Sequence, residues 1–335
     1  MQFPSPHSSN LAARPIAPRS YSVSVLAQIK DTLEVLRPYF DDEDVNEIMV
    51  NGPDDVFISK HGREKRIPVM LSAGTIRTAI TLIASYVAKE IGEKSNRRIL
   101  SARLPGFRIE AILPPVAVNG PSMCIRRHSA KVFSIDEYIS SGVISESFAK
   151  HLESAISARQ NFLIAGGTGS GKTTFMNTAL SMIPADERLF VIETVHELQV
   201  KSENCVLIEC DEDQGVTPRM AVRTAMRYAP KRIIVGELRG PEAHDWKDAA
   251  NTGHPGSAAT IHANSANSTL SRLENLLLSA DMGVPYEPLC ASIGETVQWM
   301  FYIQRDGPVR KVSQVSRLHG YDRKRSEYEI ETFQQ

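Results

Sequence analysis

One segment of eight residues limits the possible folds of this chain more than any other feature. Residues 166–173 read Gly-Gly-Thr-Gly-Ser-Gly-Lys-Thr, follow an apolar run at 161–165 and precede a segment with helical periodicity. The glycines let successive backbone N–H groups turn towards one anion without clashes between Cβ atoms. A strand, a glycine-rich loop and the N-terminus of a helix, in this order, are typical of a phosphate-binding loop in a parallel α/β fold.

The chain around this loop alternates between strand-like and helical segments. We expect a helix near residues 145–159 and further apolar strands at 189–192, 206–208 and 232–236. Such alternation predicts a mostly parallel sheet with helices on both faces. From Trp299 onwards the chain is polar and rich in strand-like runs, whose place in the fold the pattern does not fix.

The first part of the chain predicts a smaller α/β domain, and a length of 335 residues also favours two domains. Its expected elements are helices at 23–40 and 72–91 and strands at 47–50, 56–60, 107–113 and 122–127. The resulting division is a disordered leader (1–22), an N-terminal α/β domain (23–128), a linker (129–142) and a C-terminal domain with the phosphate loop (143–335). A capping-box pattern at 134–137 predicts that a short helix starts within the linker.

Composition narrows the class of protein. Hydrophobic residues make up 42% of the chain and charged residues 23%, which is ordinary for a globular protein. The formal net charge is −1, so constitutive nucleic-acid binding is not expected. The four cysteines form no CxxC pair, which favours a reducing compartment over a disulfide or zinc scaffold. The leader lacks an apolar run, and we expect a cytoplasmic protein without a membrane anchor.

The loop itself predicts which groups hold a nucleotide. Lys172 would place its charge on the β- and γ-phosphates, and the Thr173 hydroxyl would ligate Mg²⁺. ATP and Mg²⁺ are therefore the expected cofactors. The other loop residues expected to bind nucleotide are Gly167, Thr168, Gly169, Ser170, Gly171 and Thr174.

Hydrolysis also needs carboxylates for the metal and for the attacking water. Glu237 follows the apolar run 233–236, at the strand end where ligands bind in open α/β sheets. Glu193 follows the apolar run 189–192 and is the second candidate, with Glu197 as an alternative nearby. Which glutamate acts as the general base stays open at this point.

Histidines and arginines supply further candidates. His254 and His262 flank a small-residue strand in a segment that could respond to the γ-phosphate. Guanidinium groups suit phosphate because they donate two parallel hydrogen bonds. The arginines considered for this role are Arg103, Arg108, Arg126, Arg127, Arg219, Arg223, Arg227 and Arg239.

Together these segments resemble the secretion-ATPase family, and most closely the TrbB-type conjugal transfer ATPases. The resemblance runs from residue 45 to about residue 289, and its most specific part is Gly-His-Pro-Gly-Ser at 253–257 with Thr-Ile-His-Ala at 260–263, behind Gly-Glu-Leu-Arg at 236–239. It implies a RecA-like C-terminal motor domain, a smaller α/β N-terminal domain, and a ring that is usually hexameric. It also implies docking at the cytoplasmic face of the inner membrane, beside inner-membrane secretion components and companion ATPases.

The resemblance assigns roles to single residues. Arg108 and Arg126 match N-terminal-domain arginines that reach the phosphates, and Glu237 matches the Walker B glutamate. Glu193 matches the acidic box, and His254 and His262 match the His box. Arg227 and Arg239 also keep their family matches. Two positions depart from the pattern: Thr194 replaces the second acidic residue, and residues 226–231 lack one arginine and one aspartate.

The predicted function is Mg²⁺-dependent ATP hydrolysis that powers type IV secretion or conjugal transfer. Glu237 would polarise the water, Glu193 would support the metal or its water shell, and His262 would sense the γ-phosphate. The alternatives are a pilus assembly or retraction ATPase, a hexameric DNA helicase or translocase, and a nucleotide-binding scaffold that does not hydrolyse. The sequence leaves open the transported substrate, the ring size and the partner proteins.

Overall fold

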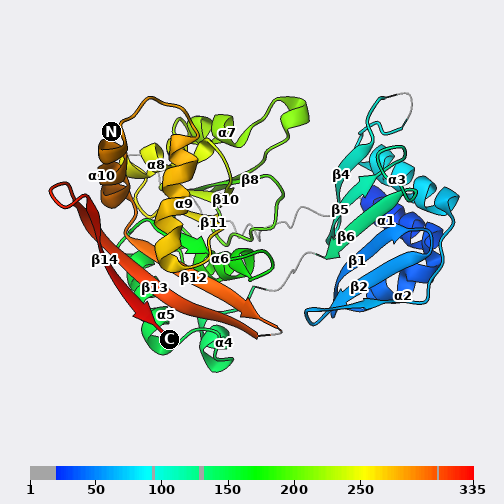
Figure 1. The fold of residues 1–335 in the computed structure, drawn as a ribbon, viewed down its shortest axis with the longest axis horizontal. Coiled ribbons are helices and arrows are strands. Elements are labelled where there is room, and N and C mark those ends of the chain that lie inside the picture. Colours follow the sequence, from blue (N-terminus) through cyan, green and yellow to red (C-terminus); the bar gives the residue numbers. More distant parts are fainter. Residues whose placement is uncertain (1–19, 93–94, 128–131, 308) are drawn as a thin grey trace, which may run out of the picture. The chain divides into compact units, whose positions relative to one another are not determined.

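The computed structural model describes residues 20–92, 95–127, 132–307 and 309–335 (Figure 1). The chain forms two compact units, Met1–His128 (unit 1) and Ser129–Gln335 (unit 2), and each is described here by itself. Most of the predicted leader and the start of the predicted linker lie outside the described residues. The last residues of that leader, from Ser20, already belong to the first helix. Within the described ranges, every helix is too short or too polar to span a lipid bilayer.

Unit 1 is an antiparallel sheet with helices packed on one face. Its strands follow the order β3-β2-β1-β6-β5-β4. Its elements are α1 (Ser20–Thr32), η1 (Glu34–Leu36), α2 (Arg37–Asp41), β1 (Val45–Gly52), β2 (Asp55–Lys60), β3 (Arg63–Arg66), α3 (Ala73–Tyr86), β4 (Ile99–Leu104), β5 (Phe107–Ile112) and β6 (Ser122–Arg127).

The sequence prediction for unit 1 differs from the structure in one helix and omits two strands. The helix expected at 23–40 is broken into α1, η1 and α2, because Leu33 leaves the helical region and Pro38, which lacks an N–H, lies at the start of α2. Strands β3 and β4 were not predicted. Strand β3 carries four charged, exposed residues, so it has no apolar alternation by which to detect it.

The core of unit 1 follows the period of two in its strands. In β5, Phe107, Ile109 and Ala111 point into a core that also contains Ile29 of α1 and Ile80 of α3. The alternate residues of the strands therefore lie on the opposite face of the sheet, and Arg108 and Arg126 are among them.

Unit 2 is a mixed eight-stranded sheet in the order β14-β13-β12-β7-β11-β10-β8-β9. The strands β12, β7, β11, β10, β8 and β9 run parallel to one another. The remaining two, β13 and β14, are antiparallel to their neighbours. The elements are α4 (Ile135–Ser140), α5 (Glu146–Ser157), β7 (Phe162–Ala165), α6 (Lys172–Ser181), β8 (Leu189–Glu193), β9 (Cys205–Glu209), η2 (Glu212–Gln214), α7 (Pro218–Ala225), β10 (Arg232–Leu238), α8 (Glu242–Asn251), β11 (Ala258–Ile261), α9 (Ala266–Leu278), α10 (Tyr286–Thr296), β12 (Trp299–Asp306), β13 (Val309–Asp322) and β14 (Glu327–Gln334).

Helices cover both faces of this sheet, as the alternating pattern predicted (Figure 1). In β7, Phe162 and Ile164 face the core beneath α4, α5 and α6, and Leu163 and Ala165 face the core beneath α7 to α10. A strand buried on both faces has to be apolar at every position, and β7 is. The capping box at Ser134 starts α4 as expected, with Glu137 bonded back to the Ser134 N–H.

The C-terminal segment, which the sequence left unplaced, completes the sheet beside the loop strand. Trp299 and Phe301 of β12 pair in parallel with Phe162 and Ile164 of β7. One edge of β7 therefore adjoins β11 and the other adjoins β12. Residues at the carboxyl ends of both neighbours are thus brought next to the phosphate loop.

A buried ion pair lies below the amino end of β10. Arg232 is 1% exposed, and its Nε and Nη2 atoms donate to Glu187 at 2.8 and 3.0 Å. Its Nη2 also donates to the Ile156 carbonyl at 2.9 Å. These hydrogen bonds from Arg232 hold the pKa of Glu187 below its usual range.

Candidate active site

The phosphate loop (residues 166–173) lies between the carboxyl end of β7 and the first residue of α6. Gly171 has a φ of +100° and precedes the helix in the left-handed region, which favours glycine. A Cβ atom on Gly166 would lie 2.3 Å from the Ile303 carbonyl oxygen, so this position tolerates no side chain. The loop conformation is therefore fixed by glycines at the points where the backbone turns or approaches β12.

The other predicted loop residues differ in their exposure. Gly167 and Thr168 are exposed and Ser170 is buried. Thr173 and Thr174 lie half-buried in the first turn of α6. The N–H groups of this first turn lack partners within the helix, and the helix dipole adds partial positive charge, so this end of α6 attracts an anion.

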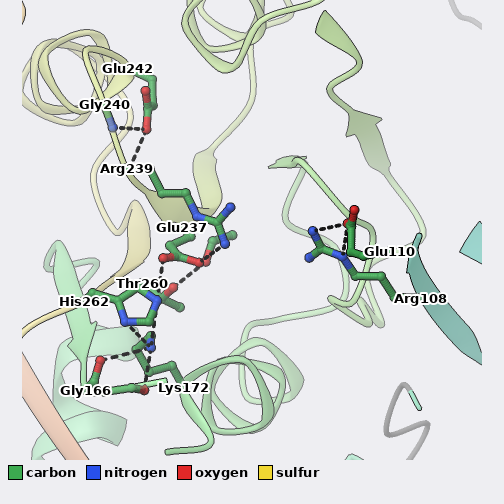
Figure 2. Close-up of polar contacts among 12 residues, drawn as sticks. Arg108, Glu110, Gly166, Lys172, Glu237, Arg239, Gly240, Glu242, Thr260 and His262 are labelled. Carbon is green, nitrogen blue, oxygen red and sulfur yellow. Dashed lines mark hydrogen bonds and ion pairs between the residues drawn. The ribbon is translucent and has the colours of Figure 1, made fainter. Parts of the chain in front are cut away.

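Lys172 lies over the loop and is largely buried. Its Nζ atom donates to the carbonyls of Gly166 and Gly167 at 3.0 and 2.9 Å. The same ammonium lies 3.3 Å from Nδ1 of His262 (Figure 2). A point charge is therefore held between the loop and the carboxyl end of β11.

A chain of polar contacts continues from Lys172 to the end of β10. The Nε2 atom of His262 lies 2.8 Å from Oε1 of Glu237, and Oε2 of Glu237 accepts from Nη2 of Arg239 at 2.7 Å. The hydroxyl of Thr260 in β11 donates to the Gly236 carbonyl in β10 at 2.5 Å, which ties the two strands together at this point (Figure 2). The structure thus brings together the predicted residues Lys172, His262, Glu237 and Arg239.

Glu237 lies at an irregular point of its strand. The pairing of β10 with β11 shifts register between Val235 and Leu238, as in a β-bulge. Bulges redirect side chains at the ends of strands. The turn that follows is held by Glu242, which accepts from the N–H groups of Arg239 and Gly240 at 2.6 and 2.8 Å.

Electrostatics favour a neutral imidazole at His262. Burial lowers its pKa most, the cations Lys172, Arg239 and Arg272 lower it further, and Glu237 opposes them. A neutral ring that accepts from Lys172 at Nδ1 carries its hydrogen on Nε2, the atom that lies beside Oε1 of Glu237. The His262 ring therefore contacts both the Lys172 ammonium and the Glu237 carboxylate.

A pocket of about 440 Å³ opens beside these groups. It is lined by Thr168, Glu237, Leu238, Arg239, His262 and Arg272. Thr168 belongs to the phosphate loop, so the pocket connects the loop to the carboxylate at the end of β10. A phosphate bound by the loop would meet a carboxylate, an imidazole and guanidinium groups here. A carboxylate can orient the attacking water, and guanidinium groups can stabilise charge on the transferred phosphoryl group.

Residues 30–300 match the family model described as "Type II/IV secretion system protein". The chain belongs to this family. It is 35% identical over 317 residues to the conjugal transfer protein TrbB of Rhizobium radiobacter, covering 93% of this chain and 95% of that protein. It is 31% identical over 337 residues to the type IV secretion system protein VirB11 of Brucella suis, covering 90% and 93% of the two chains.

The fold agrees with this membership. The solved structure of the Yersinia pseudotuberculosis ATPase DotB superposes with a TM-score of 0.60 at 19% identity, covering 83% of this chain and 74% of that one. The expected RecA-like fold of unit 2 is thereby confirmed. This secretion ATPase is an ATP-hydrolysing enzyme, and the TrbB-type resemblance seen in its sequence is confirmed.

The donor groups of this secretion ATPase fit a magnesium ion. In the part of the chain that the structure describes, no group of three or more His, Cys, Asp or Glu side chains could hold a metal by itself. Mg²⁺ prefers one or two protein ligands, with phosphate oxygens and water filling its other positions. The half-buried hydroxyl of Thr173 at the loop is a suitable oxygen donor for such an ion.

Glu193 has a different environment from Glu237. Its side chain is 5% exposed, and Oε1 accepts from the N–H groups of Glu197 and Leu198 at 2.9 and 3.0 Å. Its Oε2 lies 2.9 Å from Nδ1 of His196. Both carboxylate oxygens thus stabilise the loop after β8. The predicted contact of Glu193 to Mg²⁺ stays a prediction.

His254 and Arg227 are not brought to the phosphate loop of their own chain. His254 precedes β11 and lies 2.9 Å, at Nδ1, from the Pro230 carbonyl before β10. Arg227 follows α7 and is exposed. The phosphate loop is at the carboxyl ends of the parallel strands, whereas His254 lies at their amino ends. Roles for both residues in binding nucleotide remain predictions, and for His254 the site would be other than this loop.

Arg108 and Arg126 of unit 1 lie directly opposite each other on β5 and β6. Arg108 pairs with Glu110, with Nη2 to Oε1 at 3.1 Å (Figure 2), and Arg126 lies 3.5 Å from Glu47. Arg103 is opposite Arg108 on β4, so three guanidinium side chains form one row across the sheet. Their predicted role in phosphate binding stays a prediction.

Arg272 lines the pocket but was not a sequence candidate. It lies on α9, beyond the matched histidine segment, and its sequence neighbourhood resembles any amphipathic helix. Its proximity to His262 depends on how α9 packs against the sheet, which the local pattern does not reveal.

Proposed function

We propose that this secretion ATPase hydrolyses ATP with Mg²⁺ and assembles into a ring, a hexamer, that energises type IV secretion or conjugal transfer. The observation that carries the proposal is the continuous set of contacts from Lys172 through His262 to Glu237 beside the phosphate loop. Relatives named as conjugal transfer and type IV secretion proteins support the role, since they match nearly the whole chain.

Each group has a distinct task in this proposal. Loop N–H groups and Lys172 bind the β- and γ-phosphates, and Glu237 polarises the attacking water. Mg²⁺, ligated by the Thr173 hydroxyl, would neutralise charge on the phosphates when bound. His262 contacts both Lys172 and Glu237, so a shift of the ammonium towards a γ-phosphate alters the contact between the imidazole and the carboxylate. Arg239 orients Glu237 from its other oxygen.

We further propose that the ring works in the cytoplasm, in peripheral contact with the inner membrane. Its partners there would be inner-membrane secretion components and companion ATPases. The transported substrate, DNA or protein, is left open by this proposal. Roles as a pilus retraction or assembly ATPase, or as a DNA translocase, are alternative outcomes of the test below.

Two measurements test the proposal. Mass in solution, by light scattering with and without ATP and Mg²⁺, should show a closed ring; a chain that hydrolyses ATP as a monomer at all concentrations contradicts the assembly. In the source cells, deletion of the gene should abolish conjugal transfer or secretion, and the wild-type chain but not Lys172→Ala should restore it. Loss of pilus retraction alone, or strong stimulation of ATP hydrolysis by DNA, would favour the alternatives.

A further inference from the structure

Two arginines of the β12–β13 hairpin lie beside the phosphate loop. On β12, Phe301, Ile303 and Arg305 share one face, and the first two lie in the core against α6. On β13, Val312 joins the same core, and Arg310 precedes it by two residues. Because α6 begins at the loop, the next side chains along this face reach the loop instead of the core.

The distances place both side chains against loop glycines. A Cβ atom on Gly169 would lie 3.4 Å from Nη1 of Arg305. A Cβ atom on Gly171 would lie 3.2 Å from Cδ and 3.6 Å from Nε of Arg310. The glycines thus admit the two arginine side chains next to the loop backbone, in space that a larger loop residue would fill.

The pair carries two like charges at close range. Arg305 and Arg310 are direct partners in the antiparallel ladder of β12 and β13, an arrangement that is unfavourable for like charges. Partial burial of the otherwise exposed Arg310 lowers its pKa, and the charge of Arg305 lowers it further. Within the described ranges, neither residue forms an ion pair with a carboxylate. A bound anion would relieve this repulsion through charge-assisted hydrogen bonds.

The order of the strands indicates which part of a nucleotide would lie beside Arg305 and Arg310. Strand β7 has β11, with His262, on one side and β12, with Arg305, on the other. The γ-phosphate end of the proposed substrate belongs to the side of His262 and Glu237. A nucleotide whose β-phosphate is held by the loop therefore directs its α-phosphate and ribose towards the β12 side.

We propose that Arg305 and Arg310 bind the α-phosphate and ribose of the nucleotide, and so select nucleoside polyphosphates over shorter inorganic phosphates. This assignment rests on the proposed ATPase site. Contacts to the end of the substrate that does not react strengthen binding of the ground state and the transition state alike. They act on KM and on product affinity more than on kcat.

The test compares Arg305→Ala, Arg310→Ala and the double variant with the wild type. KM for ATP and Kd for ADP, the latter by displacement of a fluorescent ADP analogue, should rise about tenfold to a hundredfold, the size expected for loss of a hydrogen bond to a charged group. The value of kcat should fall by a smaller factor. The inhibition constant of inorganic pyrophosphate against ATP should change less than that of ADP, because pyrophosphate lacks the nucleoside. Arg305→Lys should recover part of the loss.

Arg325→Ala is the matched control, because Arg325 lies exposed at the β13–β14 turn, where it pairs with Asp322. It should leave KM and Kd unchanged, and the melting temperatures of all variants should match. Unaltered ADP affinity in the double variant would overturn the proposal. Loss of ring assembly with unchanged nucleotide affinity would also overturn it and assign the pair to a subunit contact.

The tests separate the arginine assignment from the proposed ATPase site. If Lys172→Ala is inactive while the arginine variants behave like the wild type, only the arginine assignment fails. If Lys172→Ala hydrolyses ATP normally, the proposed ATPase site fails first.

Discussion

The Nε2 atom of His262 lies 2.8 Å from Oε1 of Glu237, at the adjacent carboxyl ends of β11 and β10. On its other side, the same imidazole lies 3.3 Å from the ammonium of Lys172. One ring therefore touches both the group expected to bind phosphate and the group expected to polarise water. Any movement of Lys172 towards a bound phosphate changes the surroundings of the carboxylate.

Glu237→Gln should separate binding from cleavage. The amide keeps the shape of the side chain but loses the charge that polarises the attacking water, so single-turnover cleavage should fall about 10²- to 10⁴-fold. ATP affinity should stay within about threefold, because the loop and Lys172 are unchanged. Glu203→Gln, an exposed glutamate in a loop, is the control. Cleavage at the wild-type rate would exclude Glu237 as the base.

Glu193→Gln should act mainly on stability. The substitution weakens the hydrogen bonds from the N–H groups of Glu197 and Leu198 and the contact to His196. Loss of a buried acceptor of this kind costs about 1–3 kcal/mol, which corresponds to a drop in melting temperature of roughly 2–12 °C for a unit of this size. Scanning calorimetry measures it. An unchanged melting temperature together with lost cleavage would instead place Glu193 in the hydrolytic step.

His262 predicts an acid limit to activity and stability. Its folded pKa lies below the ordinary value of 6.5, mainly because of burial. Below 6.5 the unfolded chain takes up a proton that the folded chain resists, so this contribution to stability is lost as pH falls from 6.5 towards the folded pKa. A protonated ring also repels Lys172.

The measurement is kcat/KM between about pH 5 and about pH 8 for the wild type and His262→Asn. The wild type should lose activity on the acid side, and the variant, which cannot titrate, should have a lower but flatter profile there. Acid limbs of the same shape in both proteins would rule out His262 as the titrating group.

The buried pair of Arg232 and Glu187 predicts a large stability effect far from the loop. Arg232→Met leaves the Glu187 carboxylate buried without its main partner, which should cost about 3–5 kcal/mol. The exposed pair of Arg325 and Asp322 is the comparison, and Arg325→Ala should change stability by less than about 0.5 kcal/mol. Urea denaturation measures both; equal midpoints for the two variants would contradict this account of Arg232.

The sequence predicted the phosphate loop and the parallel strands of unit 2 because both depend on local patterns. Every position of β7 is apolar, and a helix follows directly after the glycine-rich loop, so the local pattern and the fold agree. It did not predict that β12 pairs with β7, since this contact joins residues more than a hundred positions apart. Arg305 and Arg310 were therefore never candidates.

The two histidines illustrate a different limit of prediction from the sequence. His254 and His262 are close in sequence and were predicted as one segment, but the strand β11 runs between them. An extended strand advances about 3.3 Å per residue, so residues that flank it lie at opposite ends of the sheet. Hydrogen-bond partners are a third feature that the sequence does not reveal. Glu193 and Glu237 both follow apolar strands, but only the structure reveals that Glu193 accepts from loop N–H groups.

Cleavage of ATP at the phosphate loop is tested most directly by Lys172→Ala. Phosphate release by the purified protein should depend on both ATP and Mg²⁺, and the variant should be slower by at least about 100-fold. The control is Lys150→Ala, an exposed side chain on α5, which should keep the wild-type rate. Near-normal phosphate release by a folded Lys172→Ala variant would contradict the account.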